Sequence, residues 1–67
     1  MQTTTTATGT ALRTLRQAAG LTLQQVAAGA GVSISYLSRV ENGLTAPRPQ
    51  WVQVVTEYLG SRIEDAA

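Results

Sequence analysis

The chain has 67 residues, a net charge of +1 and neither cysteine nor histidine, and this composition excludes several kinds of site. A chain of this size forms one small domain that buries only about 60% of its unfolded surface, and no disulfide can reinforce it. Without cysteine or histidine, a metal would have carboxylates as its main ligands, and a nucleophilic serine would lack its commonest general base. No apolar run approaches the roughly 20 residues of a membrane span, and no signal peptide is recognisable. We therefore expect a cytoplasmic, non-enzymatic protein with no metal, cofactor, small-molecule ligand or membrane partner.

The charges are unevenly distributed along the sequence. Four of the five arginines precede Pro49, and three of the four acidic residues follow it. A small protein whose basic side chains gather in one half is suited to a surface that faces phosphate groups.

The N-terminal part of the sequence predicts a short leader and one helix. Residues 1–8, MQTTTTAT, are polar and of low complexity, and we expect them to be disordered. A first helix is predicted over residues 9–19, with its leucines on one apolar stripe, and Gly20 is expected to end it. The folded domain is therefore expected to span residues 9–67.

Residues 21–43 predict two short helices joined by a tight turn. Thr22 and Gln25 have the spacing of a capping box at the start of the first helix, and Gly31 follows its last apolar residue. Ser33 then caps the second helix almost at once, and Gly43 ends it. Two helices joined by so short a turn must cross steeply and at close range.

The spacing of small and apolar residues in this stretch is that of a DNA-binding helix-turn-helix. Ala27 is small enough for the inside of the bend, and Gly31, four positions later, can adopt the left-handed conformation that the turn needs. Leu37 follows six positions after that glycine, and Val40 three positions further on. The string G-L-T-x-x-x-V-A-x-x-A-G-V-S-x-S-Y-L-S-R-V-E-N-G resembles the Cro and phage-repressor (XRE-like) helix-turn-helix family, with the core of the motif at residues 22–43.

The C-terminal part predicts a fourth helix. Pro49 can occupy its first turn, and its apolar residues follow an i, i+3, i+4, i+7, i+8 stripe that is typical of a core-facing surface. These residues are Trp51, Val54, Val55, Tyr58 and Leu59. Gly60 is expected to end the helix, and a capping box at Ser61 leaves a short fifth helix open. The sequence thus predicts an all-α, repressor-type domain of four helices, with a short fifth as an addition.

Two opposite charges are expected to lean toward the core from different helices. Arg16 lies roughly 40° from the direction of Leu12 on the first helix, and Glu41 lies roughly 40° from that of Leu37 on the third. An unpaired buried charge costs several kcal/mol, so we predict a salt bridge between Arg16 and Glu41. The resemblance supports this pair, because family members often join these two helices in the same way.

The resemblance implies that the helix over residues 33–42 enters the major groove of double-stranded DNA. Arg39 at the centre of its polar face can bond a guanine through two hydrogen bonds. The residues predicted to contact bases are Ile34, Ser35, Ser38 and Arg39. The residues predicted to contact phosphates are Thr22, Gln24, Tyr36, Asn42 and Arg48. Many family members have a phosphate-binding glutamine where this chain has Leu23, and Gln24 is the candidate to replace it.

These features predict a sequence-specific transcriptional regulator, in the simplest case a repressor that occupies a promoter. Other roles on the same fold stay open, namely a restriction-modification controller, an antitoxin-type autoregulator, or a recombination or lysogeny factor. A protein-interaction module without DNA affinity is the alternative from a different class, and the low net charge and Leu23 keep it open. Catalysis is not expected, because the serines have neither histidine nor lysine to activate them.

The predicted partner is a palindromic operator bound by two copies of the chain. One helix in the groove contacts only a few base pairs, too few to select one site in a genome, and a symmetric dimer would double the site. The large apolar side chains of the fourth helix exceed what a core of mostly Ala, Val and Leu can cover. We therefore expect a weak homodimer through residues 51–67.

Overall fold

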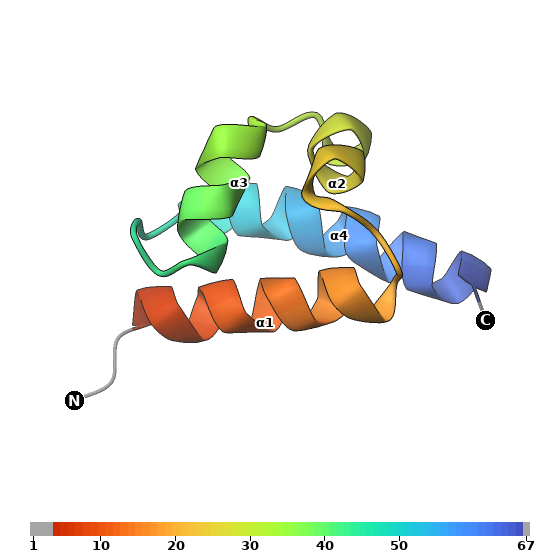
Figure 1. The fold of residues 1–67 in the computed structure, drawn as a ribbon, viewed down its shortest axis with the longest axis horizontal. Helices are drawn as coiled ribbons and strands as arrows, with labels where there is room; N and C mark the ends of the chain where they lie inside the picture. Colours follow the sequence, from red (N-terminus) through yellow and green to blue (C-terminus); the bar gives the residue numbers. More distant parts are fainter. Residues whose placement is uncertain (1–3, 67) are drawn as a thin grey trace.

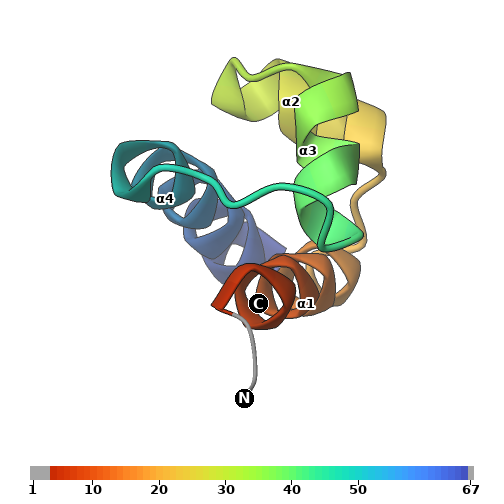
Figure 2. The ribbon, with the colours of Figure 1, turned by 90° about the vertical axis from the view of Figure 1, so that its left-hand side faces the viewer.

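The computed structural model describes residues 4–66, with side chains described over residues 8–64. The chain forms four helices: α1 (Thr4–Ala18), α2 (Leu23–Ala30), α3 (Ile34–Glu41) and α4 (Pro49–Ala66). The two long helices, α1 and α4, extend along the long direction of the molecule, and the two short helices lie above them (Figure 1). Seen from the end, α1 and α2 each lie between α3 and α4, and each packs on both (Figure 2). The predicted all-α fold of four helices is confirmed.

One core lies inside this ring of helices. Every helix contributes to it, and its buried apolar residues are Leu12, Val26, Ala27, Leu37, Val40, Val55 and Leu59. The only buried charged residue among those described is Glu41, and no buried polar side-chain atom in the described part of the chain lacks a hydrogen-bond partner. The core therefore contains one charge, which must be neutralised by a partner.

Local sequence explains where α2 begins and how the chain turns into α3. Thr22 Oγ1 accepts a hydrogen bond from the backbone N–H of Gln25 at 3.1 Å, and the side-chain oxygen Gln25 Oε1 accepts one from the backbone N–H of Thr22 at 2.8 Å. The predicted capping box therefore forms. Gly31 has φ 71° and ψ 36°, the left-handed conformation expected at the end of the helix. Ser33 Oγ then accepts from the Tyr36 amide at 3.2 Å and caps α3.

The first helix begins at Thr4 and not at Gly9, so residues 4–8 of the predicted leader are helical. Gly9 is a buried residue inside α1, and a Cβ at this position would collide with the carbonyl oxygen of Val40 at the end of α3. This glycine therefore allows two helices to approach each other and does not mark a helix start. Once α1 is anchored there, extending it adds one hydrogen bond per residue, and threonine weakens a helix only slightly. Residues 1–3 of the predicted leader lie outside the described residues.

The last helix also extends beyond its predicted bounds. α4 continues through Gly60 to Ala66, where the sequence predicted an end at Gly60 and left a short fifth helix open. A glycine inside a helix costs only about 1 kcal/mol relative to alanine, and packing outweighs this when the buried side continues beyond it, as the half-buried Ile63 indicates. Val54, predicted as core, is 46% exposed, because Val55 and Leu59 define the inward direction and Val54 lies roughly 100° from Val55 around the helix.

Candidate nucleic-acid interface

The polar side chains of α3 form one continuous arc on the side of the helix that faces away from the core. Leu37 and Val40 are fully buried on the inner side. Ile34 is 40% exposed, Ser35 and Arg39 are exposed, and Ser38 is half-buried. At roughly 100° per residue, these four side chains and Asn42 fall within an arc of roughly 140°. The structure thus brings the four residues predicted to contact bases, Ile34, Ser35, Ser38 and Arg39, together on one surface with Asn42, which was predicted to contact a phosphate. We call these five residues the polar arc.

The arginine of the polar arc, Arg39, contacts one aromatic ring, which in turn contacts a second. The guanidinium carbon of Arg39 lies 5.8 Å from the centre of the Tyr36 ring, within the range of a cation–π interaction. The Tyr36 ring in turn meets Trp51 of α4 edge to face, with ring centres 5.1 Å apart and an angle of 79° between the planes. Tyr36 was predicted to contact a phosphate, and in the structure its ring is half-buried between these two neighbours.

The salt bridge expected between Arg16 and Glu41 is present. Arg16 Nε donates to Glu41 Oε2 at 2.8 Å and Nη2 donates to Oε1 at 2.9 Å, which is a bidentate pair between α1 and the end of α3. The side chain of Glu41 is 2% exposed and that of Arg16 is 15% exposed. The hydrogen bond to Glu41 raises the pKa of the Arg16 guanidinium, so this group stays charged over the whole ordinary pH range.

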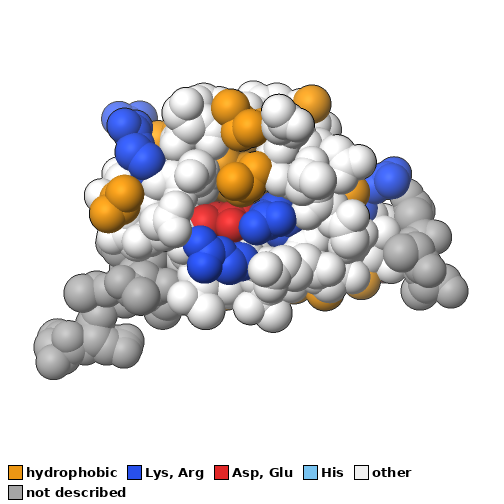
Figure 3. Space-filling view, viewed as in Figure 1, with side chains coloured by type: hydrophobic (Ala, Val, Ile, Leu, Met, Phe, Trp, Pro, Cys, Tyr) orange, Lys and Arg blue, Asp and Glu red, His pale blue; other side chains and the backbone are white. Residues whose placement is uncertain are grey.

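A second arginine, Arg13, also contacts Glu41, and this contact was not predicted from the sequence. Arg13 Nε lies 3.5 Å from Glu41 Oε1, and Arg13 Nη2 donates to Asn42 Oδ1 at 2.9 Å. The only clue in the sequence was its position three residues before Arg16, on the same side of a helix. Figure 3 shows the acidic group between basic side chains on the face that α1 and α3 form. Two arginines share one carboxylate, so this cluster keeps a net positive charge.

Asn42, predicted to contact a phosphate, lies at the end of the polar arc, and its side chain already makes internal hydrogen bonds to Arg13 and Ser38. Its Oδ1 accepts from Arg13, and its Nδ2 donates to the carbonyl oxygen of Ser38 at 2.9 Å. The side chain therefore fixes the last turn of α3 to α1. It is nevertheless exposed, so its amide stays accessible from outside.

The other residues predicted to contact phosphates are exposed at the rim of the motif. Thr22 and Gln24 lie at the start of α2, and Arg48 lies in the loop before α4. Leu23 packs against the core, so the position where many family members have a polar side chain is an apolar contact in this chain. Gln24, the candidate replacement, points to solvent beside it. The contacts of all these residues with DNA stay predictions.

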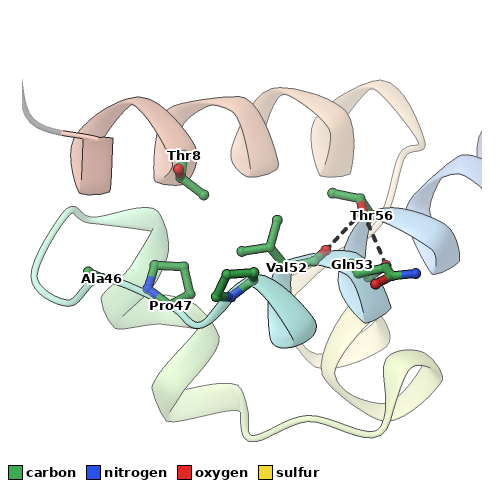
Figure 4. Close-up of a pocket in the computed structure, with 7 residues that line it drawn as sticks. Thr8, Ala46, Pro47, Val52, Gln53 and Thr56 are labelled. Carbon is green, nitrogen blue, oxygen red and sulfur yellow. Dashed lines mark hydrogen bonds between the residues drawn. The ribbon is translucent and has the colours of Figure 1, made fainter.

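A hollow of about 450 Å³ lies between the beginning of α1, the loop before α4 and α4 itself (Figure 4). Its lining residues are Thr8, Ala46, Pro47, Pro49, Val52, Gln53 and Thr56. None of them is charged, and none belongs to the residues predicted to contact DNA. In the described part of the chain, no three acidic side chains gather as a metal site would require, and no helix is long and apolar enough to cross a membrane.

A capped helix, a left-handed glycine turn and a second helix with an exposed polar arc together define a helix-turn-helix DNA-binding domain. The chain belongs to the helix-turn-helix domain family, whose sequence profile matches residues 7–67. The HTH-type transcriptional regulator DdrOP3 of Deinococcus deserti is 39% identical over 54 residues, which are 81% of this chain and 42% of that protein. The chain thus spans less than half the length of this relative. No solved structure matches it. Regulators of this family are typically non-enzymatic.

Proposed function

We propose that this domain binds a specific double-stranded DNA sequence with α3 in the major groove and thereby regulates transcription, in the simplest case as a repressor. The observation that carries the proposal is the polar arc on α3, opposite a side that Leu37 and Val40 fix in the core. An α-helix fits the major groove, where each base pair offers a distinct set of hydrogen-bonding groups. The name of the relative DdrOP3 supports transcriptional regulation over the other roles of this fold. When bound to its operator, the protein acts at the nucleoid in the cytoplasm.

The proposed contacts divide into bases and phosphates. Arg39 bonds a guanine, Ser35 and Ser38 bond neighbouring base edges, and Ile34 contacts a thymine methyl group. The exposed side chains of Thr22, Gln24 and Arg48, together with the hydroxyl of Tyr36 and the amide of Asn42, bond phosphates on either side. The positive end of the α2 dipole adds to the attraction at Thr22.

We further propose that two copies bind a palindromic operator. A single α3 contacts only a few base pairs, and a two-fold dimer with half-sites about 34 Å apart would double the sequence that is selected. The dimer contact is proposed for residues 51–67, where Val54 offers an exposed apolar side chain. Because Leu59 is buried in the protein's own core, the available apolar area is small and the dimer should be weak without DNA.

Selection of bound sequences from a random duplex pool tests the proposal as a whole. We expect a defined sequence with two-fold symmetry, and an affinity that falls steeply as salt is added. A protein-interaction module would show no appreciable affinity for any duplex, even at low salt. Sedimentation with and without the selected duplex should give two subunits per site, and one subunit on an asymmetric sequence would refute the dimer.

Two arginine variants then separate base contacts from phosphate contacts. Arg39→Ala should lose roughly 1–3 kcal/mol at the selected site and relax the preference at one base position. Arg48→Ala removes the same charge from the rim, and it should weaken all sequences alike and lower the salt slope by about 1. If Arg39→Ala weakened every sequence equally, the proposed role of Arg39 at a base would be wrong.

A further inference from the structure

The side chain of Arg39 is exposed, yet it is in contact with a neighbouring ring. A free arginine side chain has several rotatable bonds, and holding it in one orientation costs up to roughly 2 kcal/mol of conformational entropy. Here the guanidinium lies 5.8 Å from the centre of the Tyr36 ring, three residues earlier on the same helix. The face of an aromatic ring attracts a cation at this distance, so the Tyr36 ring restricts where the guanidinium lies before any DNA arrives.

The Tyr36 ring is itself in contact with a second aromatic ring. Trp51 of α4 meets it edge to face at 5.1 Å, a geometry that the quadrupoles of two aromatic rings favour. Both rings pack against the buried core, whereas Arg39 is exposed. The three side chains therefore form a series of contacts from Trp51 of α4, through Tyr36 of α3, to Arg39 in the polar arc.

We infer that Tyr36 is a positioning residue, whose ring orients Arg39 toward its base and is itself oriented by Trp51. This inference rests on the proposed function, since it assigns to the ring a part in base selection by Arg39. It is distinct from the phosphate contact predicted for Tyr36, because that contact uses the hydroxyl and not the ring. A guanidinium held beside the groove before binding loses less freedom when it bonds a guanine, and so discriminates better between bases.

Two substitutions at Tyr36 separate the ring from the hydroxyl. Tyr36→Phe keeps the ring and its contacts with Arg39 and Trp51, and it should leave the base preference unchanged. Tyr36→Leu keeps an apolar side chain but removes the ring, and it should reduce the preference at the base position of Arg39 by about two- to fivefold, with no change at other positions or in the salt slope. In an Arg39→Ala background, Tyr36→Leu should have no further effect on that position.

The experiment measures binding of each variant to the selected duplex and to its single-base variants, over a range of salt concentrations. Weakening by Tyr36→Leu that is equal on all sequences, with the preference at the base position of Arg39 unchanged, would overturn the inference, because the ring would then contribute only to the fold. A loss of that preference in Tyr36→Phe as large as in Tyr36→Leu would also overturn it, since the hydroxyl and not the ring would then orient Arg39. If the wild-type protein had no base preference at all, the proposed function itself would fail, which is a different outcome.

A measurement without DNA covers the case in which Tyr36→Leu does not fold. The ring current of Tyr36 should shift the NMR resonances of the Arg39 side chain upfield in the wild-type protein and in Tyr36→Phe. Arg48, which lies in an exposed loop and makes no cation–π contact among the described residues, serves as the internal reference. Arg39 resonances at the positions of a freely rotating arginine would refute the contact between Arg39 and the Tyr36 ring.

Discussion

Replacing Gly9 with alanine should destabilise the protein, although this substitution inside a helix is ordinarily favourable by about 1 kcal/mol. The new Cβ would collide with the carbonyl oxygen of Val40, and it would lie 3.1 Å from the Val40 carbonyl carbon and 3.2 Å from that of Glu41. These are backbone atoms, so no side chain can rotate away, and α1 must move away from the end of α3. Overpacking of this kind costs typically about 1–3 kcal/mol. Because the collision is with backbone atoms, we take the upper part of this range, about 2–3 kcal/mol, so the gain in helix propensity leaves a net loss of about 1–2 kcal/mol.

Gly60→Ala is the matched control for this substitution. Gly60 also lies inside a long helix, and a Cβ built there has nothing within 4 Å. The same change should therefore stabilise the protein by about 0.5–1 kcal/mol. Gly29→Ala should have an effect on stability between those of the other two, because its Cβ would collide with the ring of Tyr58. This side chain can move away, but α4 and α2 would then lose the contact that it makes between them.

Urea unfolding followed by circular dichroism and by the fluorescence of Trp51 measures all three variants. With a slope of about 1 kcal/mol per molar urea for so small a domain, the midpoint of Gly9→Ala should fall by about 1–2 M, and that of Gly60→Ala should rise. A midpoint for Gly9→Ala at or above that of the wild-type protein would refute the close approach of α1 to α3. A loss of stability in Gly60→Ala would contradict the continuation of α4 through this residue.

Other substitutions test the contacts between helices and the caps. Glu41→Ala should cost roughly 3 kcal/mol because Arg16 stays behind without its partner, and a double-mutant cycle with Arg16→Ala should show strong non-additivity in urea unfolding. Arg13→Ala should cost less than about 1 kcal/mol in the same assay, because this side chain is 43% exposed. The pKa of Arg16 is raised in the folded protein, so its contribution to the free energy of unfolding is complete below its unfolded pKa and is lost only as the pH rises through its folded pKa. The difference in thermal stability between the wild-type protein and Arg16→Ala should therefore be the same at pH 7 and pH 9. Thr22→Ala removes one half of the capping box and should lower the free energy of unfolding by about 1 kcal/mol. An unchanged value would mean that water satisfies the Gln25 backbone N–H as well as the Thr22 hydroxyl does.

The parts of the fold that could be predicted from the sequence depend on interactions between residues close together in the chain. The capping box at Thr22, the left-handed Gly31 and the cap at Ser33 each join residues no more than four positions apart, and all three were predicted. The salt bridge between Arg16 and Glu41 joins distant residues, yet it was predictable. Helical geometry turns both side chains inward, and a buried charge requires a partner.

The features that sequence reasoning missed depend on how two helices are placed relative to each other. Gly9 was interpreted as the start of a helix, because the sequence alone contains no sign that the end of α3 lies against it. Arg13 points to the side of its own helix, and only the position of α3 brings it to Glu41 and Asn42. Val54 was assigned to the core by periodicity, and the direction in which α4 faces left it exposed.

The missed contacts and the predicted ones meet at α3, which is held from three sides. The three-residue turn at Gly31 fixes its start to α2, and Gly9 together with the arginines of α1 fixes its end. Trp51 of α4 fixes its flank through Tyr36. A helix held in this way cannot rotate about its own axis without breaking a buried ion pair, so its polar arc has one orientation before any partner binds. A DNA-binding domain with this fold would order few groups on binding. Its selectivity would then depend on the side chains of the polar arc and not on folding of the helix that carries them.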